Sequence, residues 1–167
     1  MELSTVHTAP RLKQIIGGGL GTVSVAGSCP GSNCNQGDQC LYFMISGSLA
    51  PIHGILGGGA TSISACLVAD DSTFQGDGTG GGCDSASGNG QLTGKSGTGV
   101  DMVLAGNICN SFPLQNDDML LLGHSTYKIT GGSGKMSTAT GVGSIELALD
   151  LTTANVTLSL SGSFTRH

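Results

Sequence analysis

The segment NVTLSLSGSFT, residues 155–165, carries the clearest structural signal in the sequence. Its apolar residues and its glycine alternate with serine and threonine, so that every second side chain belongs to one face. This period of two is typical of an antiparallel strand with one buried face. Working outward, residues 143–151 alternate in the same way, and only residues 152–154 separate the two segments. The pair therefore predicts a β-hairpin.

The same alternation recurs along the rest of the chain. Strand-like segments occupy residues 20–27, 41–49, 61–69, 99–109 and 119–130, and weaker candidates lie at residues 51–56 and 90–95. Glycine clusters separate these segments, and helical periodicity is nearly absent, which favours an all-β fold. We predict a single antiparallel eight-stranded β-barrel, with a β-sandwich as the alternative. A closed barrel also removes free strand edges, which the few charged residues of this chain would protect poorly.

One domain accounts for the whole chain, because 167 residues suffice for a single hydrophobic core. Residues 1–19 are interpreted as an N-terminal arm and residues 20–167 as the barrel domain, with long glycine-rich loops at residues 28–40 and 70–90. The composition excludes a helical bundle or coiled coil. Such folds use Glu in quantity, whereas Glu occurs here only at positions 2 and 146.

The charge distribution excludes several partners. The formal net charge is −5 with only six Lys and Arg residues, and none of these lies between Lys13 and Lys95. Phosphate groups are bound by clustered Lys and Arg, so we expect no nucleic acid as a partner. No run of 18 apolar residues is present, so we expect no membrane span.

The cysteines indicate the compartment. An even number of cysteines in a small, glycine-rich domain predicts three disulfides that stabilise the fold, and hence an oxidising location, extracellular or periplasmic. Fifteen pairings are possible, and the sequence does not choose between them. A thiolate metal site is the weaker alternative, because no Cys-x-x-Cys pair occurs. Residues 15–27 make a poor signal peptide, so the chain is interpreted as a mature form. The six cysteines are Cys29, Cys34, Cys40, Cys66, Cys83 and Cys109.

Residues 127–141 read YKITGGSGKMSTATG, a strand with an aromatic end, a glycine-rich turn and an apolar step. This pattern resembles the late strands of the allene oxide cyclase and dirigent-like barrels, over roughly the last 50 residues. Gly131, Gly132 and Gly134 would supply the tight turn, while Met136 and Ala139 would return into the barrel end. The resemblance implies an eight-stranded barrel with an apolar lumen, and cyclisation without a cofactor in some members. It carries over no catalytic residues, because the matched segment is a turn.

Three residues are candidates for a site inside a barrel. His53 lies in a short apolar segment and could face a lumen, although a structural histidine is the commoner situation. Tyr42 and Tyr127 could hydrogen-bond a ligand carbonyl, although such tyrosines more often close a barrel end. No nucleophile elbow, zinc-protease motif, phosphate loop or dinucleotide fingerprint occurs, so no cofactor is expected.

Four acidic residues form the candidate metal site. Asp70, Asp71, Asp77 and Asp84 lie in or beside a glycine-rich stretch, and carboxylates suit calcium. The spacing is not that of an EF-hand, because no Glu closes the ligand set. The alternative is a solvated acidic loop without metal.

Two functional hypotheses follow. The first is an exported, non-catalytic module with a structural or binding role, because no set of acid–base residues is clustered in the sequence. We expect such a module to assemble into a homo-oligomer. The second is a cofactor-free cyclase or dirigent-like protein, or a carrier of an apolar small molecule, because the barrel lumen would be apolar.

Overall fold

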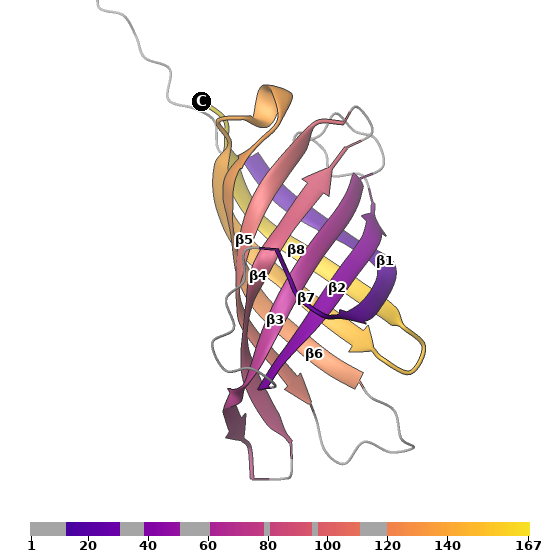
Figure 1. Ribbon diagram of the computed structural model, residues 1–167. Helices are drawn as coiled ribbons and strands as arrows, with labels where there is room; N and C mark the ends of the chain where they lie inside the picture. The colour runs from indigo at the N-terminus through magenta and orange to yellow at the C-terminus, as the bar shows by residue number, and fades with distance from the viewer. Residues whose placement is uncertain (1–12, 31–38, 51–60, 79–80, 95–96, 111–119) are drawn as a thin grey trace, which may run out of the picture.

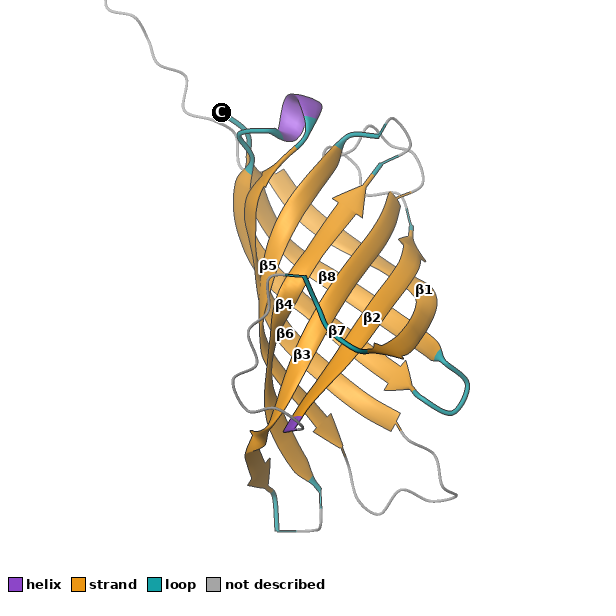
Figure 2. Cartoon of the chain, in the orientation of Figure 1, coloured by secondary structure: helices purple, strands orange, loops and turns teal. Residues whose placement is uncertain are grey.

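The computed structural model describes residues 13–30, 39–50, 61–78, 81–94, 97–110 and 120–167 (Figure 1). Eight antiparallel strands form a closed barrel in which each strand pairs with its neighbours in sequence, and β1 pairs with β8 (Figure 2). The elements are β1 (Lys13–Ala26), β2 (Cys40–Leu49), β3 (Thr61–Gly76), β4 (Gly82–Thr93), β5 (Gly99–Asn110), β6 (Leu120–Gly132), the 3-10 helix η2 (Gly134–Met136), β7 (Thr140–Asp150) and β8 (Asn155–Thr165).

The closed barrel confirms the predicted fold class and excludes the sandwich alternative. The predicted C-terminal hairpin is present: β7 and β8 pair up to Asp150 and Asn155, and the turn between them contains Ala154 in the left-handed region, with φ 58°. Most of the weak candidate at residues 90–95 lies in β4, while the candidate at residues 51–56 lies outside the described residues.

The structure differs from the expected boundaries at two places. β1 begins at Lys13 and pairs with β8 as far as Thr22, so residues 13–19 belong to the barrel rather than to an arm. The glycines at 17–19 resemble a turn signal, yet a Cβ on Gly19 would collide with the backbone of Ser48, so glycine here allows β1 to run close to β2.

The glycine-rich stretch at residues 70–90 is also not a loop. β3 continues through it to Gly76, and β4 starts at Gly82, so only the tip of a hairpin lies between them. Of the expected loop at 28–40, residues 28–30 follow β1 outside the sheet, whereas 31–38 lie outside the described residues.

The core fills the middle of the barrel because apolar side chains alternate along most strands, whereas β4 contributes only Ala86 and Leu92. In the middle of the barrel, the side chains of one parity point inward and are almost completely shielded from solvent. Burial of a Leu, Ile or Phe side chain stabilises the fold by about 1.5–3 kcal/mol. The largest fully buried side chains are Tyr127, Phe43, Phe164, Ile15, Ile45, Ile63, Leu67, Leu92, Met102, Leu104 and Ile129.

One end of the barrel, here called the capped end, is closed by the turn between β6 and β7. Helix η2 directs Met136 into the barrel, where Met136, Ala139 and Phe164 are at most 2% exposed. Ser133 ties this turn to the neighbouring β4–β5 turn: its N–H donates to the carbonyl oxygen of Gly99 at 2.9 Å, and its hydroxyl oxygen accepts the N–H of Gly99 at 3.0 Å.

The three turn glycines occupy distinct positions in this cap. Gly134 has a φ of 58°, which glycine adopts at little cost. A Cβ on Gly132 would collide with the carbonyl oxygen of Gly99, so a larger residue would separate the cap from β5. Gly131 has a φ of 154° and lies opposite Asp101, where the pairing of β5 with β6 is irregular.

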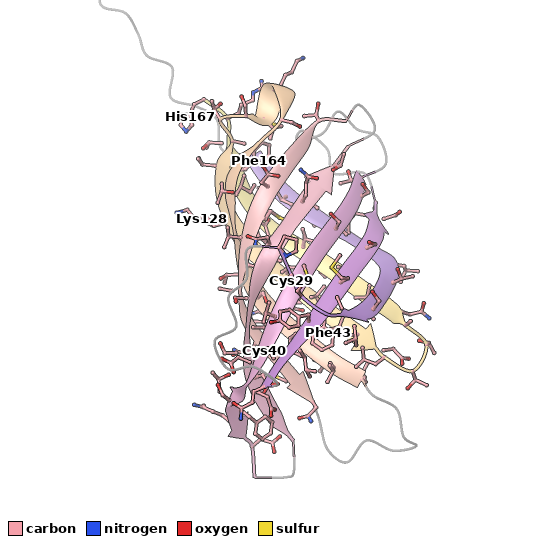
Figure 3. All side chains as sticks on the ribbon, in the orientation of Figure 1. Cys29, Cys40, Phe43, Lys128, Phe164 and His167 are labelled. Carbon is pink, nitrogen blue, oxygen red and sulfur yellow. A yellow bond between two sulfur atoms is a disulfide. The ribbon has the colours of Figure 1, made fainter. Side chains whose placement is uncertain are left out.

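The opposite end, here called the hairpin end, carries the β3–β4 hairpin and the β7–β8 turn (Figure 1). After β1 the chain crosses the outer surface of the barrel, where the disulfide Cys29–Cys66 fastens it to β3 and the Asn89 side-chain amide of β4 donates to the Pro30 carbonyl oxygen at 3.4 Å (Figure 3). A second disulfide, Cys83–Cys109, joins β4 to β5 at the hairpin end.

These two bridges confirm the expected disulfide stabilisation. They span 37 and 26 residues of sequence. By reducing the chain entropy of the unfolded state, each stabilises the fold by about 3.5–4 kcal/mol. Cys40 is also disulfide-bonded, and Cys34 lies outside the described residues. The disulfides indicate an oxidising compartment.

No helix in the described part of the chain has both the length and the hydropathy needed to cross a membrane.

Candidate functional site

A mostly apolar pocket of about 310 Å³ opens at the hairpin end of the barrel. Its walls come from six of the eight strands, β1 to β6, and from the β7–β8 turn, so the inward faces converge on it. Its volume is at the lower limit of ordinary small-molecule sites. The pocket is lined by Val25, Leu41, Phe43, Ala69, Asp71, Phe74, Gly82, Asp84, Ile108, Asn110, Leu121 and Leu151.

A bulge of several residues in β3 shapes one wall of this pocket. Asp70 pairs with Ser85 and Gln75 pairs with Cys83, so the four residues from Asp71 to Phe74 all lie opposite Asp84. Extra residues of this kind bend a strand and redirect its side chains, and bulges are frequent beside binding sites. Here the bulge contributes both Asp71 and Phe74 to the pocket lining.

Short hydrogen bonds hold the bulge in shape. The backbone N–H of Ser72 donates to Asp70 Oδ1 at 3.0 Å, and the Thr73 hydroxyl donates to the carbonyl oxygen of Asp70 at 2.6 Å. The N–H of Ser85 on β4 donates to the same Thr73 hydroxyl oxygen at 2.8 Å. The side chains of Asp70 and Thr73 thus take over the backbone partners that regular strand pairing would supply.

Asp84 is the polar group of the pocket whose hydrogen bonding is incomplete. Its side chain lies on the inward face of β4, and its Oδ1 atom is shielded from solvent and accepts no hydrogen bond. Burial raises the pKa of the Asp84 carboxyl, and the nearby charges of Asp71 and Asp70 raise it further. A buried carboxylate oxygen without a donor is unfavourable, so Asp84 gains from any donor that enters the pocket.

The rim beside Asp84 is ordered by Asn110 and Phe74. The N–H of Gly82 donates to Asn110 Oδ1 at 2.9 Å, which fixes the carboxamide at the pocket edge. The Phe74 ring lies against Gly82, where a Cβ would come within 2.6 Å of the ring. Phe74 is 46% exposed, so part of an aromatic face is presented at the mouth of the pocket.

The two candidate tyrosines lie away from this pocket. Tyr127 points into the barrel and is 2% exposed, and its hydroxyl donates to the carbonyl oxygen of Ser161 at 3.1 Å. Its ring covers Gly143 and Gly162, where any Cβ would collide with it. Burial raises the pKa of Tyr127 to about 12. Tyr42 faces outward and packs against the cluster of Cys29, Cys40, Cys66 and Val68.

The remaining candidates are placed as follows. His53 lies outside the described residues. No group of three or more His, Cys, Asp or Glu residues in the described part of the chain is arranged to hold a metal ion, so the structure does not bring Asp70, Asp71, Asp77 and Asp84 together as a calcium site. Asp77 lies at the hairpin tip, where its N–H donates to the carbonyl oxygen of Gly81 at 3.0 Å.

Sequence reasoning missed most of the pocket lining. Asn110 continues the alternation of Val100 to Ile108, so parity alone could have placed it on the inward face. The sequence indicates Asp84 as a candidate, but in an expected loop rather than in β4. Asp71 continues the alternation of Ile63 to Ala69, so parity could have placed it on the inward face as well. Phe74 breaks this parity and faces the pocket because of the β3 bulge, and no sequence signal that we identified indicates that bulge.

Comparisons with known proteins add no further assignment: no family model, no curated protein and no solved structure matches this chain. The resemblance of residues 127–141 to the allene oxide cyclase and dirigent-like barrels therefore stays a prediction.

Proposed function

We propose that the protein is an exported, non-catalytic β-barrel module that binds a small apolar molecule in the pocket at its hairpin end. The supporting observation is the pocket itself, in which apolar side chains from β1, β2, β5 and β6 surround about 310 Å³. At about 30 Å³ per water-sized group, this volume holds about ten non-hydrogen atoms. The disulfides support an extracellular or periplasmic location.

The test uses two neighbouring leucines of β6. Leu121 lines the pocket, whereas Leu122 faces outward and is 49% exposed. Titration of the wild-type protein with octanol, followed by amide NMR shifts and by calorimetry, should show saturable binding with shifts at Gly82 and Asn110. Leu121→Trp should abolish this binding because the indole fills the pocket, and Leu122→Trp should leave it unchanged. Equal binding by both variants would reject the proposal, as would the absence of saturable binding of any eight-carbon probe, neutral or charged, by the wild type.

A second candidate function is self-association, which the outer face of β8, β1 and β2 favours. The outward positions of these strands hold Ser, Thr, Asn, Gln, Gly and apolar residues, without a charged side chain between Gln14 and Ser48 or between Asn155 and Thr165 in the described part. On this face Ile16 and Leu20 are 72% and 71% exposed. Two copies can therefore meet here without bringing charged side chains of these strands into contact.

Sedimentation distinguishes this second candidate. A homo-oligomer should dissociate in the variant Ile16→Lys/Leu20→Lys, whereas Val142→Lys, which changes an exposed valine on β7, should sediment like the wild type. A wild-type protein that remains monomeric at millimolar concentration would reject the candidate.

The cyclase hypothesis stays a prediction. It would require the same pocket to hold a reactive intermediate, with Asp71 and Asp84 as the ionisable groups among its described lining residues.

A further inference from the structure

The polar groups of the hairpin-end pocket indicate which head group its ligand has. This inference rests on the proposed binding function. Its apolar wall would accept any small hydrophobic molecule, so selectivity must come from the few polar groups that it contains. Asp84 is the polar group with an unsatisfied, solvent-shielded oxygen. A ligand that brings a hydrogen-bond donor to this carboxyl supplies the missing bond.

The electrostatics of the rim favour a charged donor over a neutral one. The bulge in β3 places Asp71 in the lining beside Asp84, and Asp70 is close enough to act on Asp84 by its charge. The other described lining residues, from β1, β2, β5, β6 and the β7–β8 turn, are apolar apart from Asn110, and none is Lys, Arg or His. A neutral hydroxyl satisfies only the hydrogen bond, whereas a cation also offsets the repulsion among these carboxylates.

We propose that the pocket selects an apolar amine, with its protonated ammonium group bound at Asp84 beside Asp71 and its hydrocarbon part among Phe43, Ile108 and Leu121. The volume limits the hydrocarbon part to about eight to ten carbons. The exposed ring of Phe74 at the mouth adds an aromatic face that attracts a cation during entry.

The experiment compares three probes of equal chain length at pH 7 by calorimetry, each below its micelle concentration: octylamine, octanol and octanoate. They present a cationic, a neutral and an anionic head on the same tail. We expect octylamine to bind at least tenfold more tightly than octanol, and octanoate to bind more weakly than octanol. Amide shifts at Gly82 and Asn110 would locate each probe.

Matched variants assign the preference to a residue. Asp84→Asn keeps the size of the side chain and should reduce the preference for octylamine over octanol to about threefold or less, with octanol affinity retained. Asp71→Asn, at an exposed rim position, should reduce the preference by about twofold to fivefold. Asp101→Asn removes the same charge from the outer face of β5, where Asp101 accepts a hydrogen bond from Gln91, and should leave the preference unchanged.

The outcomes separate the two proposals. Saturable binding of octanol with no preference for octylamine would overturn the amine inference and leave the binding function intact. Absence of saturable binding for all three probes would reject the binding function itself. A preference that survives in both Asp84→Asn and Asp71→Asn would also overturn the inference, because the ammonium group would then bind elsewhere.

Discussion

The capped end and the hairpin end of the barrel are built from the same alternating strands, yet they differ in what fills them. At the capped end, η2 returns Met136 into the barrel, and with Ala139 and Phe164 it closes the interior. At the hairpin end, the β3 bulge faces Asp84, and a pocket of about 310 Å³ remains. Alternation thus produces the core, whereas departures from regular pairing decide whether an end is closed or open.

The largest expected effect comes from a substitution at the capped end. Phe164→Ala should lower the free energy of unfolding by about 3–5 kcal/mol, because it removes a buried ring from tightly packed surroundings. Phe74→Ala removes a phenyl ring from the hairpin end, where Phe74 is 46% exposed. This substitution should lower the free energy of unfolding by about 1 kcal/mol or less. Urea denaturation of both variants measures the contrast. Equal losses would show that the two ends do not differ in packing as described.

The next largest effect concerns the disulfide Cys83–Cys109 at the hairpin end. Cys83→Ala/Cys109→Ala should lower the free energy of unfolding by about 3.5 kcal/mol, since a 26-residue loop is no longer constrained. Hydrogen exchange should accelerate first at Asp84 and Ile108, which pair across β4 and β5 next to the bridge. Uniform acceleration that includes Met136 at the capped end would contradict a local role for this bridge.

A smaller effect tests the packed interior between the two ends. Tyr127→Phe deletes the hydroxyl that donates to Ser161 and should lower the free energy of unfolding by about 1 kcal/mol.

The same tyrosine has a measurable alkaline signature. The chain has two tyrosines, so in Tyr42→Phe the absorbance at alkaline pH reports Tyr127 alone. Its pKa is raised to about 12, so stability is full below pH 10 and is lost as the pH rises through about 12. Ionisation of Tyr127 near pH 10 in a folded protein would contradict its burial.

The smallest effect concerns the Asp84 carboxyl at the hairpin end. Asp84→Asn should raise the free energy of unfolding slightly at pH 7, because it removes a carboxylate that lacks a donor and is repelled by Asp71 and Asp70. The pKa of Asp84 is raised above 3.8, so the wild type regains this stability as the pH falls through the raised pKa, and the variant does not. Thermal melts from pH 3 to pH 7 measure the difference. Destabilisation of the variant at pH 7 would contradict the unfavourable state of this carboxyl.

The sequence contains enough information for the barrel but not for its pocket. Alternation in residues 143–151 and 155–165 requires only local reading, so strand number and hairpin pairing could be predicted. The start of β1 could not, because Gly17–Gly19 looks like a turn until the neighbouring backbone of Ser48 is known to need that space. The pocket depends on how β3 and β4 align around Asp84, which is a property of two strands together. The disulfide pairing was undetermined for the same reason, since it depends on register.

Closure by the ladder between β1 and β8 has a consequence for how the chain must fold. Lys13 pairs with Phe164, so the first and last strands close the sheet through contacts between distant parts of the sequence. Such a high contact order slows folding, and no ribosome-bound fragment that lacks β8 can complete the structure. Until β8 arrives, two strand edges with few charges stay exposed to aggregation. Completion of the barrel therefore waits for β8, however early the other seven strands have been synthesised.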